Sequence, residues 1–166
     1  PTGEQPLGPF FPREGTPINP HREDGTPGVP LHLASDSDLT VVKGKSGKAE
    51  GQVVFVKGKV MDENNHPVKN ANLVIWQASH TGRYNHLGDD DNIDFVDPRT
   101  GRVIKRKLDE SFQYWGKAKT NEKGEYVFKT IVPGFYPADL NSKWYRPPHI
   151  HFLVTAMGFS EFVTQM

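Results

Sequence analysis

The chain has 166 residues, enough for one domain with a sizeable hydrophobic core and too few for two. Twenty basic residues balance twenty acidic ones, so the composition gives no indication of a nucleic-acid partner or an anionic membrane. Cysteine is absent, which excludes disulfides, thiolate metal sites and cysteine nucleophiles, and no apolar run is long enough to cross a bilayer. The first residue is proline, which fits either removal of a leader or trimming. The compartment is left open: the cytoplasm is slightly favoured, and an exported form is the alternative.

Glycine and proline crowd residues 1–30, where no periodic apolar pattern appears. This composition predicts an extended arm laid over the surface and anchored by Phe10 and Phe11, with a disordered leader as the equal alternative. We therefore expect residues 1–50 to form an arm and lead-in, and residues 51–166 to form the body of a single domain.

From residue 52 onward the pattern is that of an all-β protein. A β-branched run, QVVFVKGKVM, ends in the turn cluster DENNHP and is followed by a second run, ANLVIWQAS. A turn at Asn121–Gly124 separates two further strand patterns, and Gly158 separates HIHFLVTAM from SEFVTQ. No segment has a sustained helical period, so the spacing predicts a β-sandwich with long loops.

One insertion, residues 86–110, is strongly charged and is expected to be loop. It carries four aspartates that could bind a cation: Asp89, Asp90, Asp91 and Asp94. Because the run is rich in turn residues, a solvated loop is the preferred interpretation and a calcium site the second one.

Two histidines, His149 and His151, follow a double proline and begin an apolar segment. On a strand, side chains two residues apart point to the same face, so the two imidazoles should lie side by side. Proline cannot donate to a β-ladder and is best placed at the start of a strand, which fits this position. A His-x-His pair is half of a common metal site, but buried histidines satisfied by backbone groups are also frequent.

Two tyrosines in turn-rich segments could complete such a site. Tyr136 lies in VPGFYPADL, which we expect to be loop, and Tyr84 lies in WQASHTGRYNH, just after a strand. Taken alone, each is more simply a packed aromatic with a hydrated hydroxyl. A hard trivalent cation would deprotonate both phenols. Fe(III) bound by two phenolates and two neutral imidazoles would have a single positive charge, which one hydroxide ligand would neutralise.

Four segments in order resemble one known family. They are TGEQPLGPFFP, GKVMDENNHPVKNANLVIWQASHTGRYNH, DESFQYWGKAKTNEKGEYVFKTIVPGFYP and YRPPHIHF. Together they are similar to the intradiol ring-cleaving dioxygenases, the family of protocatechuate 3,4-dioxygenase and catechol 1,2-dioxygenase. The resemblance covers most of the chain and implies a catalytic β-sandwich.

The resemblance implies a ferric ion held by four side chains, Tyr84, Tyr136, His149 and His151, with Tyr136 as the ligand that leaves when substrate binds. It further implies that Arg146 stabilises charge on the substrate and that Gln165 lies near the oxygen site. The implied reaction cleaves a small aromatic diol between its two hydroxyl-bearing carbons with O2 and yields a muconate-type diacid. A homo-oligomer is compatible with the resemblance, whereas nucleic-acid and membrane partners are not expected.

The chain departs from the family pattern at several positions. Asn65 replaces a turn glycine, and asparagine tolerates the left-handed conformation that such a turn needs. Ala138 and Asp139 stand where protocatechuate enzymes carry a tryptophan and a basic residue, which predicts a catechol without a ring carboxylate. No segment of these 166 residues resembles the helical dimerisation domain of the catechol enzymes, and the given sequence ends at Met166, where family members continue into another strand.

Two other functions compete with this interpretation. The strand segments also resemble transthyretin-like β-sandwich modules that bind without catalysis. A zinc hydrolase built from His149, His151 and one aspartate would use the same histidine pair with an open fourth position.

Overall fold

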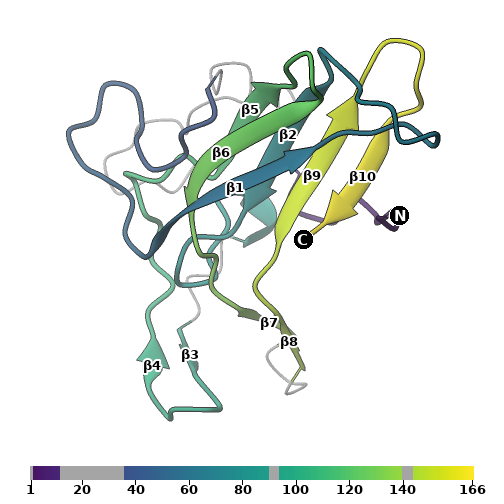
Figure 1. Ribbon diagram of the computed structural model, residues 1–166. Coiled ribbons are helices and arrows are strands. Elements are labelled where there is room, and N and C mark those ends of the chain that lie inside the picture. The colour runs from purple at the N-terminus through teal and green to yellow at the C-terminus, as the bar shows by residue number, and fades with distance from the viewer. Residues whose placement is uncertain (1, 12–35, 90–93, 140–143) are drawn as a thin grey trace.

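The computed structural model describes residues 2–11, 36–89, 94–139 and 144–166, and its elements are strands apart from one short 3-10 turn (Figure 1). This confirms the predicted all-β class. None of the described residues belongs to a helix with the length and hydrophobicity needed to span a membrane. In chain order the elements are β1 (Val53–Lys59), β2 (Asn72–Gln77), η1 (Leu87–Asp89), β3 (Phe95–Val96), β4 (Val103–Ile104), β5 (Trp115–Lys119), β6 (Glu125–Ile131), β7 (Tyr136–Asp139), β8 (Trp144–Arg146), β9 (Ile150–Thr155) and β10 (Phe162–Gln165).

Two antiparallel layers form the body of the molecule. A four-stranded sheet has the order β10-β9-β2-β5, and the ribbon β1-β6 lies across one of its faces (Figure 1). Because side chains alternate along a strand, β2 sends Leu73 and Ile75 toward the ribbon, where Val56 and Phe128 meet them in the buried core. Trp76, one residue further along β2, points to the opposite face of the sheet, which is the face that carries the candidate site.

A short segment of the lead-in joins the two layers at one side. The backbone of Leu39 donates to Lys129 in β6 at 2.8 Å, and the backbone of Lys117 in β5 donates to Asp36 at 2.9 Å. The Leu39 side chain is fully buried. Residues 36–39 therefore hold β5 and β6 together, which closes this side of the core.

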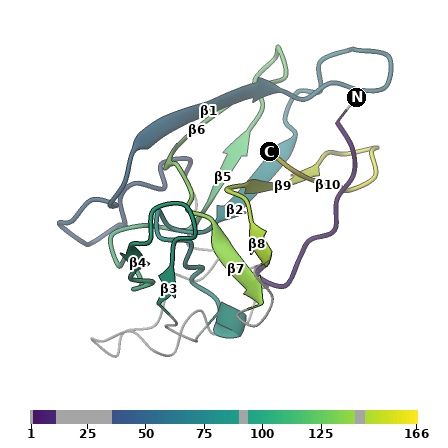
Figure 2. The ribbon, with the colours of Figure 1, turned by 90° about the horizontal axis from the view of Figure 1, so that it is seen from below.

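The N-terminal arm runs beside β10 and on toward the ends of β7 and β8 (Figure 2). Its backbone is fastened to β10 at two points: Gln5 N–H donates to the Val163 carbonyl at 2.8 Å, and the Thr164 hydroxyl donates to the Gly3 carbonyl at 2.7 Å. Phe11 packs edge-on against Trp76 with ring centroids 4.8 Å apart. The expected anchored arm is thus confirmed for residues 2–11, while residues 12–30 lie outside the described part of the chain.

The predicted turns hold, but the charged insertion is not all loop. Asn65 has φ 63° and Gly158 has φ 84°, the left-handed values that these turns require. Within residues 86–110 the chain forms η1 and the two-stranded hairpin β3-β4. The hairpin forms because Phe95 is buried against Phe135, a contact between residues far apart in sequence that local charge patterning could not indicate.

Candidate metal centre

The segments that carry the two tyrosines are packed backbone against backbone. The N–H groups of Gly82 and Gly134 both donate to the carbonyl of Ser79, at 3.0 and 2.8 Å. A Cβ atom at either glycine would overlap a carbonyl oxygen of the opposite segment. Tyr84 and Tyr136, each two residues after one of these glycines, are therefore held at a fixed separation by a contact that only glycine permits.

Replacing Gly134 by alanine is expected to lower the free energy of unfolding by about 2 kcal/mol, because the new methyl group must push the tyrosine segments apart. Urea denaturation of the full chain measures this change. Gly3→Ala is the matched control, since a Cβ at Gly3 meets no atom within 4 Å. Equal stability of the two variants would contradict the tight approach.

Each histidine is oriented by a different contact. His149, just before β9, donates from Nδ1 to the Pro147 carbonyl at 2.6 Å, which leaves the lone pair on Nε2. His151, in β9, stacks on Trp76 with ring centroids 4.7 Å apart and an interplanar angle of 6°. Within the described residues, Nδ1 of His151 has no hydrogen-bond partner, so ring stacking fixes this imidazole.

The structure brings the four predicted ligands together. The phenol oxygen of Tyr84 lies 3.2 Å from Nε2 of His149 and 3.2 Å from Nε2 of His151. The ring of Tyr136 stands perpendicular to that of Tyr84 with centroids 5.5 Å apart, and 5.9 Å from the ring of His149. All four side chains are buried. Two oxygen and two nitrogen donors thus meet beside one face of the four-stranded sheet.

Burial keeps these donors uncharged in the absence of a cation. It raises the pKa of Tyr84 well above its ordinary value, and it also raises the pKa of Tyr136. Burial lowers the pKa of His149, and burial together with the neighbouring His149 lowers the pKa of His151 to about 3. The imidazoles therefore offer free lone pairs, and a bound cation would favour loss of the phenol protons.

The donor set suits a hard, highly charged cation more than zinc. Phenolate oxygen and imidazole nitrogen are acceptable to iron, and no thiolate is present. Across the described ranges, no three His, Cys, Asp or Glu side chains gather in a way that could hold a metal ion. The zinc hydrolase alternative, which needs an aspartate beside His149 and His151, therefore lacks its third ligand there.

A half-open cavity of about 520 Å³ reaches this centre, and Tyr136, His151, Arg146 and Gln165 form part of its wall. Arg146 donates to the Gln165 side-chain carbonyl at 3.1 Å, and its hydrogen bond and charge act to lower the pKa of Tyr136 against the effect of burial. A larger groove, about 830 Å³, lies between β1, β6 and the end of β5 and is lined by none of the four candidate ligands.

The N-terminal arm forms another wall of the cavity through Gly8, Pro9 and Phe10. The Phe10 ring stacks on Tyr84 with centroids 4.5 Å apart. A Cβ at Gly8 would lie 3.5 Å from the His151 ring, so the arm passes directly over this imidazole. The arm therefore covers part of the centre, a role beyond the anchoring that the sequence predicted.

Two predictions about site residues are wrong. Tyr136 does not lie in a loop: it is the first residue of β7 and pairs with Arg146 of β8, because the following residues form a hairpin. Asp89 is not solvated but 7% exposed, because buried Arg106 donates to both of its carboxylate oxygens at 2.8 Å. The solvated interpretation fits Asp94, whose partner Lys105 is exposed, while Asp90 and Asp91 lie outside the described residues.

Sequence reasoning did not single out Arg83 and Arg106, which surround Asp89, or Trp76, which orients His151. Both arginines lie among charged or polar neighbours that resemble an exposed surface in the sequence. Trp76 could have been found, since it is opposite His151 once β2 and β9 are aligned.

Comparison with known proteins adds three findings. A family model described as "Dioxygenase" matches residues 28–166. The chain is 37% identical over 132 residues to the protocatechuate 3,4-dioxygenase beta chain of Burkholderia cepacia, covering 79% of this chain and 51% of the relative. It is 28% identical over 162 residues to catechol 1,2-dioxygenase 2 of Acinetobacter lwoffii, covering 87% of this chain and 51% of that one.

Among solved structures, the intradiol ring-cleavage dioxygenase from Tetranychus urticae superimposes with a TM-score of 0.55 at 27% identity. The match covers 80% of this chain and 56% of that one. The chain thus spans about half the length of the curated relatives named above.

Proposed function

The chain belongs to the family of intradiol ring-cleaving dioxygenases, and on that premise we propose that it is a non-haem Fe(III) dioxygenase acting on a catechol. The reaction would use one O2, break the bond between the two hydroxyl-bearing carbons and leave both oxygen atoms in a muconate-type diacid. One observation carries the proposal: the Tyr84 oxygen lies 3.2 Å from Nε2 of both His149 and His151, at the end of a cavity lined by Tyr136.

Four side chains would hold the iron: Tyr84, Tyr136, His149 and His151. When bound, ferric iron would supply the Lewis acidity and redox chemistry that make a catechol reactive toward O2. The histidines would bind through Nε2 in orientations already set by the Pro147 carbonyl and the Trp76 ring. The tyrosines would bind as phenolates.

Tyr136 is suited to accept a proton from the substrate. It lines the cavity, whereas Tyr84 is 2% exposed and forms no part of the cavity wall. An incoming diol therefore meets Tyr136 first. Because a free phenol has a pKa of about 10, Tyr136 would retain a catechol proton at neutral pH once it gave up its metal contact.

Arg146 would stabilise negative charge on the bound diol. Its guanidinium is held in the cavity wall by its hydrogen bond to Gln165, and Arg146 is paired with Tyr136 across the β7-β8 hairpin, so it need not reorganise during the reaction. A planar, weakly hydrated cation beside a planar ring suits this task better than a mobile ammonium group.

Colour and O2 uptake test the proposal together. The full chain loaded with ferric iron is expected to show a visible phenolate-to-iron band, and to consume O2 with catechol and no added reductant, because ferric iron needs no external electron. The product should be a diacid. Cleavage beside the hydroxyl-bearing carbons, or a strict need for ferrous iron and a reductant, would contradict it. A colourless protein that binds no iron would favour the transthyretin-like module.

We further propose a catechol without a ring carboxylate as the preferred substrate. Ala138 and Asp139 lie in the cavity wall, and an aspartate there repels an anionic ring substituent. Protocatechuate is the direct competitor to test, because one relative carries that substrate in its name.

Asp139→Asn is expected to raise kcat/KM for protocatechuate relative to catechol about fivefold, the effect of removing roughly 1 kcal/mol of like-charge repulsion at short range in a hydrated cavity. Paired kinetics on the two substrates measure the ratio. Glu122→Gln, in the exposed turn between β5 and β6, is the control for a change of net charge alone. A wild-type preference for protocatechuate would refute the substrate proposal.

A further inference from the structure

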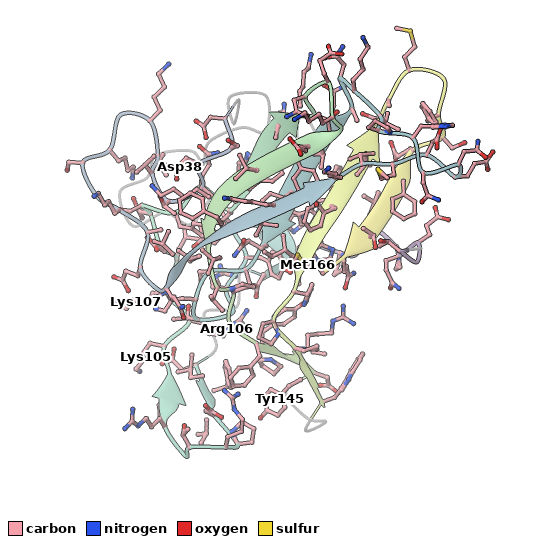
Figure 3. All side chains as sticks on the ribbon, viewed as in Figure 1. Asp38, Lys105, Arg106, Lys107, Tyr145 and Met166 are labelled. Carbon is pink, nitrogen blue, oxygen red and sulfur yellow. The ribbon has the colours of Figure 1, made fainter. Side chains whose placement is uncertain are left out.

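A buried ionic cluster lies next to the backbone of Tyr84. Asp89, Arg83 and Arg106 are 7%, 1% and 5% exposed. Arg106 Nη2 lies 2.8 Å from both Asp89 oxygens, and Arg83 Nη1 lies 3.2 Å from Oδ1. In Figure 3 Arg106 lies nearer the middle of the molecule than its neighbours Lys105 and Lys107. Three ionised side chains are thus withdrawn from water beside a candidate ligand.

The cluster is bonded to the backbone of the tyrosine segment at Gly82 and Tyr84, the residues on either side of Arg83. The Tyr84 N–H donates to Asp89 Oδ2 at 2.7 Å, and Arg106 Nη2 also donates to the Gly82 carbonyl at 2.9 Å. Arg83, between them, is joined to Asp89 through its side chain. The backbone at Gly82 and Tyr84 is therefore held by hydrogen bonds to charged groups, which are shorter and stronger than neutral ones.

Stability alone does not account for this arrangement. Burying ions costs solvation energy, and apolar side chains of the same volume often stabilise a fold equally well or better. The cluster has two cations and one anion, and within the described residues Nε of Arg83 and Nε of Arg106 have no hydrogen-bond partner. These ions instead orient the tyrosine segment, because Asp89 and Arg106 each form a short hydrogen bond to its backbone.

We propose that Asp89, with Arg83 and Arg106, is a positioning unit that fixes Tyr84 so that its phenol oxygen faces both imidazoles. The unit acts through the Tyr84 backbone and does not itself bind the metal. The catalytic role of this unit rests on the proposed function, but its effect on the position of Tyr84 can be tested without iron.

Amide hydrogen exchange in the metal-free full chain gives that test. Asp89→Asn and Arg106→Lys are expected to reduce the protection of the Tyr84 amide from exchange at least about tenfold. This is the effect of losing one hydrogen bond to a charged acceptor. The Ile75 amide in β2 is the internal reference, because a global loss of stability would lower protection there as well. Asp97→Asn is the matched control: Asp97 is also buried and bonded to an arginine, Arg99, but has no bond to the tyrosine segment.

Iron loading gives the second readout. In both variants the ferric-phenolate band should shift, and iron should pass to a chelator about tenfold to a hundredfold faster than in wild type, as when supporting contacts of a metal ligand are removed. Arg106→Lys keeps the charge and carries the test if Asp89→Asn does not fold. A folded variant with unchanged Tyr84 protection overturns the inference whether or not iron binds. Absence of the band in wild type would instead overturn the proposed function, and the exchange result would still decide the role of Asp89.

Discussion

Replacing Arg146 by lysine is expected to lower turnover by about two orders of magnitude, the effect of losing one preorganised charge, while iron and colour remain. Arg146 donates to Gln165 in the cavity wall and is paired with Tyr136 across the β7-β8 hairpin, so its planar group has a fixed position that a lysine ammonium cannot reproduce. No predicted metal ligand is changed, and for this reason the iron content should stay near that of wild type. Steady-state O2 uptake and iron analysis on the same sample measure both effects.

Arg99→Lys is the control for this substitution. The Arg99 guanidinium lies over the Phe135 ring at 4.4 Å but is absent from the cavity wall, so near-normal turnover is expected. An Arg146→Lys protein with normal turnover would show that Arg146 only packs against its neighbours. Loss of iron from it would show that the arginine supports the centre and does not act on the substrate.

The two tyrosines are expected to respond differently to substitution by phenylalanine. Tyr136→Phe should leave a coloured ferric protein, because Tyr84 still provides a phenolate, and should slow the binding and release of catechol. Tyr84→Phe should lose nearly all tyrosinate absorption once catechol is bound, since no protein phenolate would then remain. The reason is access: Tyr136 lines the cavity, whereas Tyr84 is enclosed and its backbone is bonded to Asp89.

Visible spectra of both variants, recorded without O2 and with or without catechol, measure this difference. Tyr145→Phe is the control, because Tyr145 packs among Phe95 and Phe135 near the end of the β7-β8 hairpin, away from the sandwich (Figure 3). Its spectra should match those of wild type. If the Tyr136→Phe complex loses the tyrosinate band and the Tyr84→Phe complex keeps it, the departing and remaining ligands are the reverse of those proposed.

The backbone of Tyr136 is less free to move than the sequence suggested. The sequence predicted a loop, in which a departing ligand could swing freely. The structure places Tyr136 at the first position of β7, paired with Arg146, and the pairing of that hairpin is irregular between Pro137 and Asp139. Freedom to move must therefore come from the open cavity beside the ring, while the backbone stays in the hairpin.

The strands of the two main layers, the turns between them and the four candidate ligands could be predicted from the sequence, whereas the β3-β4 hairpin and β7 could not. Alternating apolar residues and turn residues such as Asn65 and Gly158 act within a few positions of the chain, so their structural meaning can be read locally. The histidine pair was also local, because side chains two apart on a strand must share a face.

The surroundings of those ligands depend on contacts between distant segments. Asp89 lies in a charged segment that the sequence predicted to be solvated. Its carboxylate is buried because it is bonded to Arg106, seventeen positions away in the chain. The contact between the Gly82 and Gly134 segments joins parts of the chain still further apart. Burial, the separation of the tyrosines and the shape of the cavity arise from packing between distant segments, and packing of this kind leaves no local pattern in the sequence.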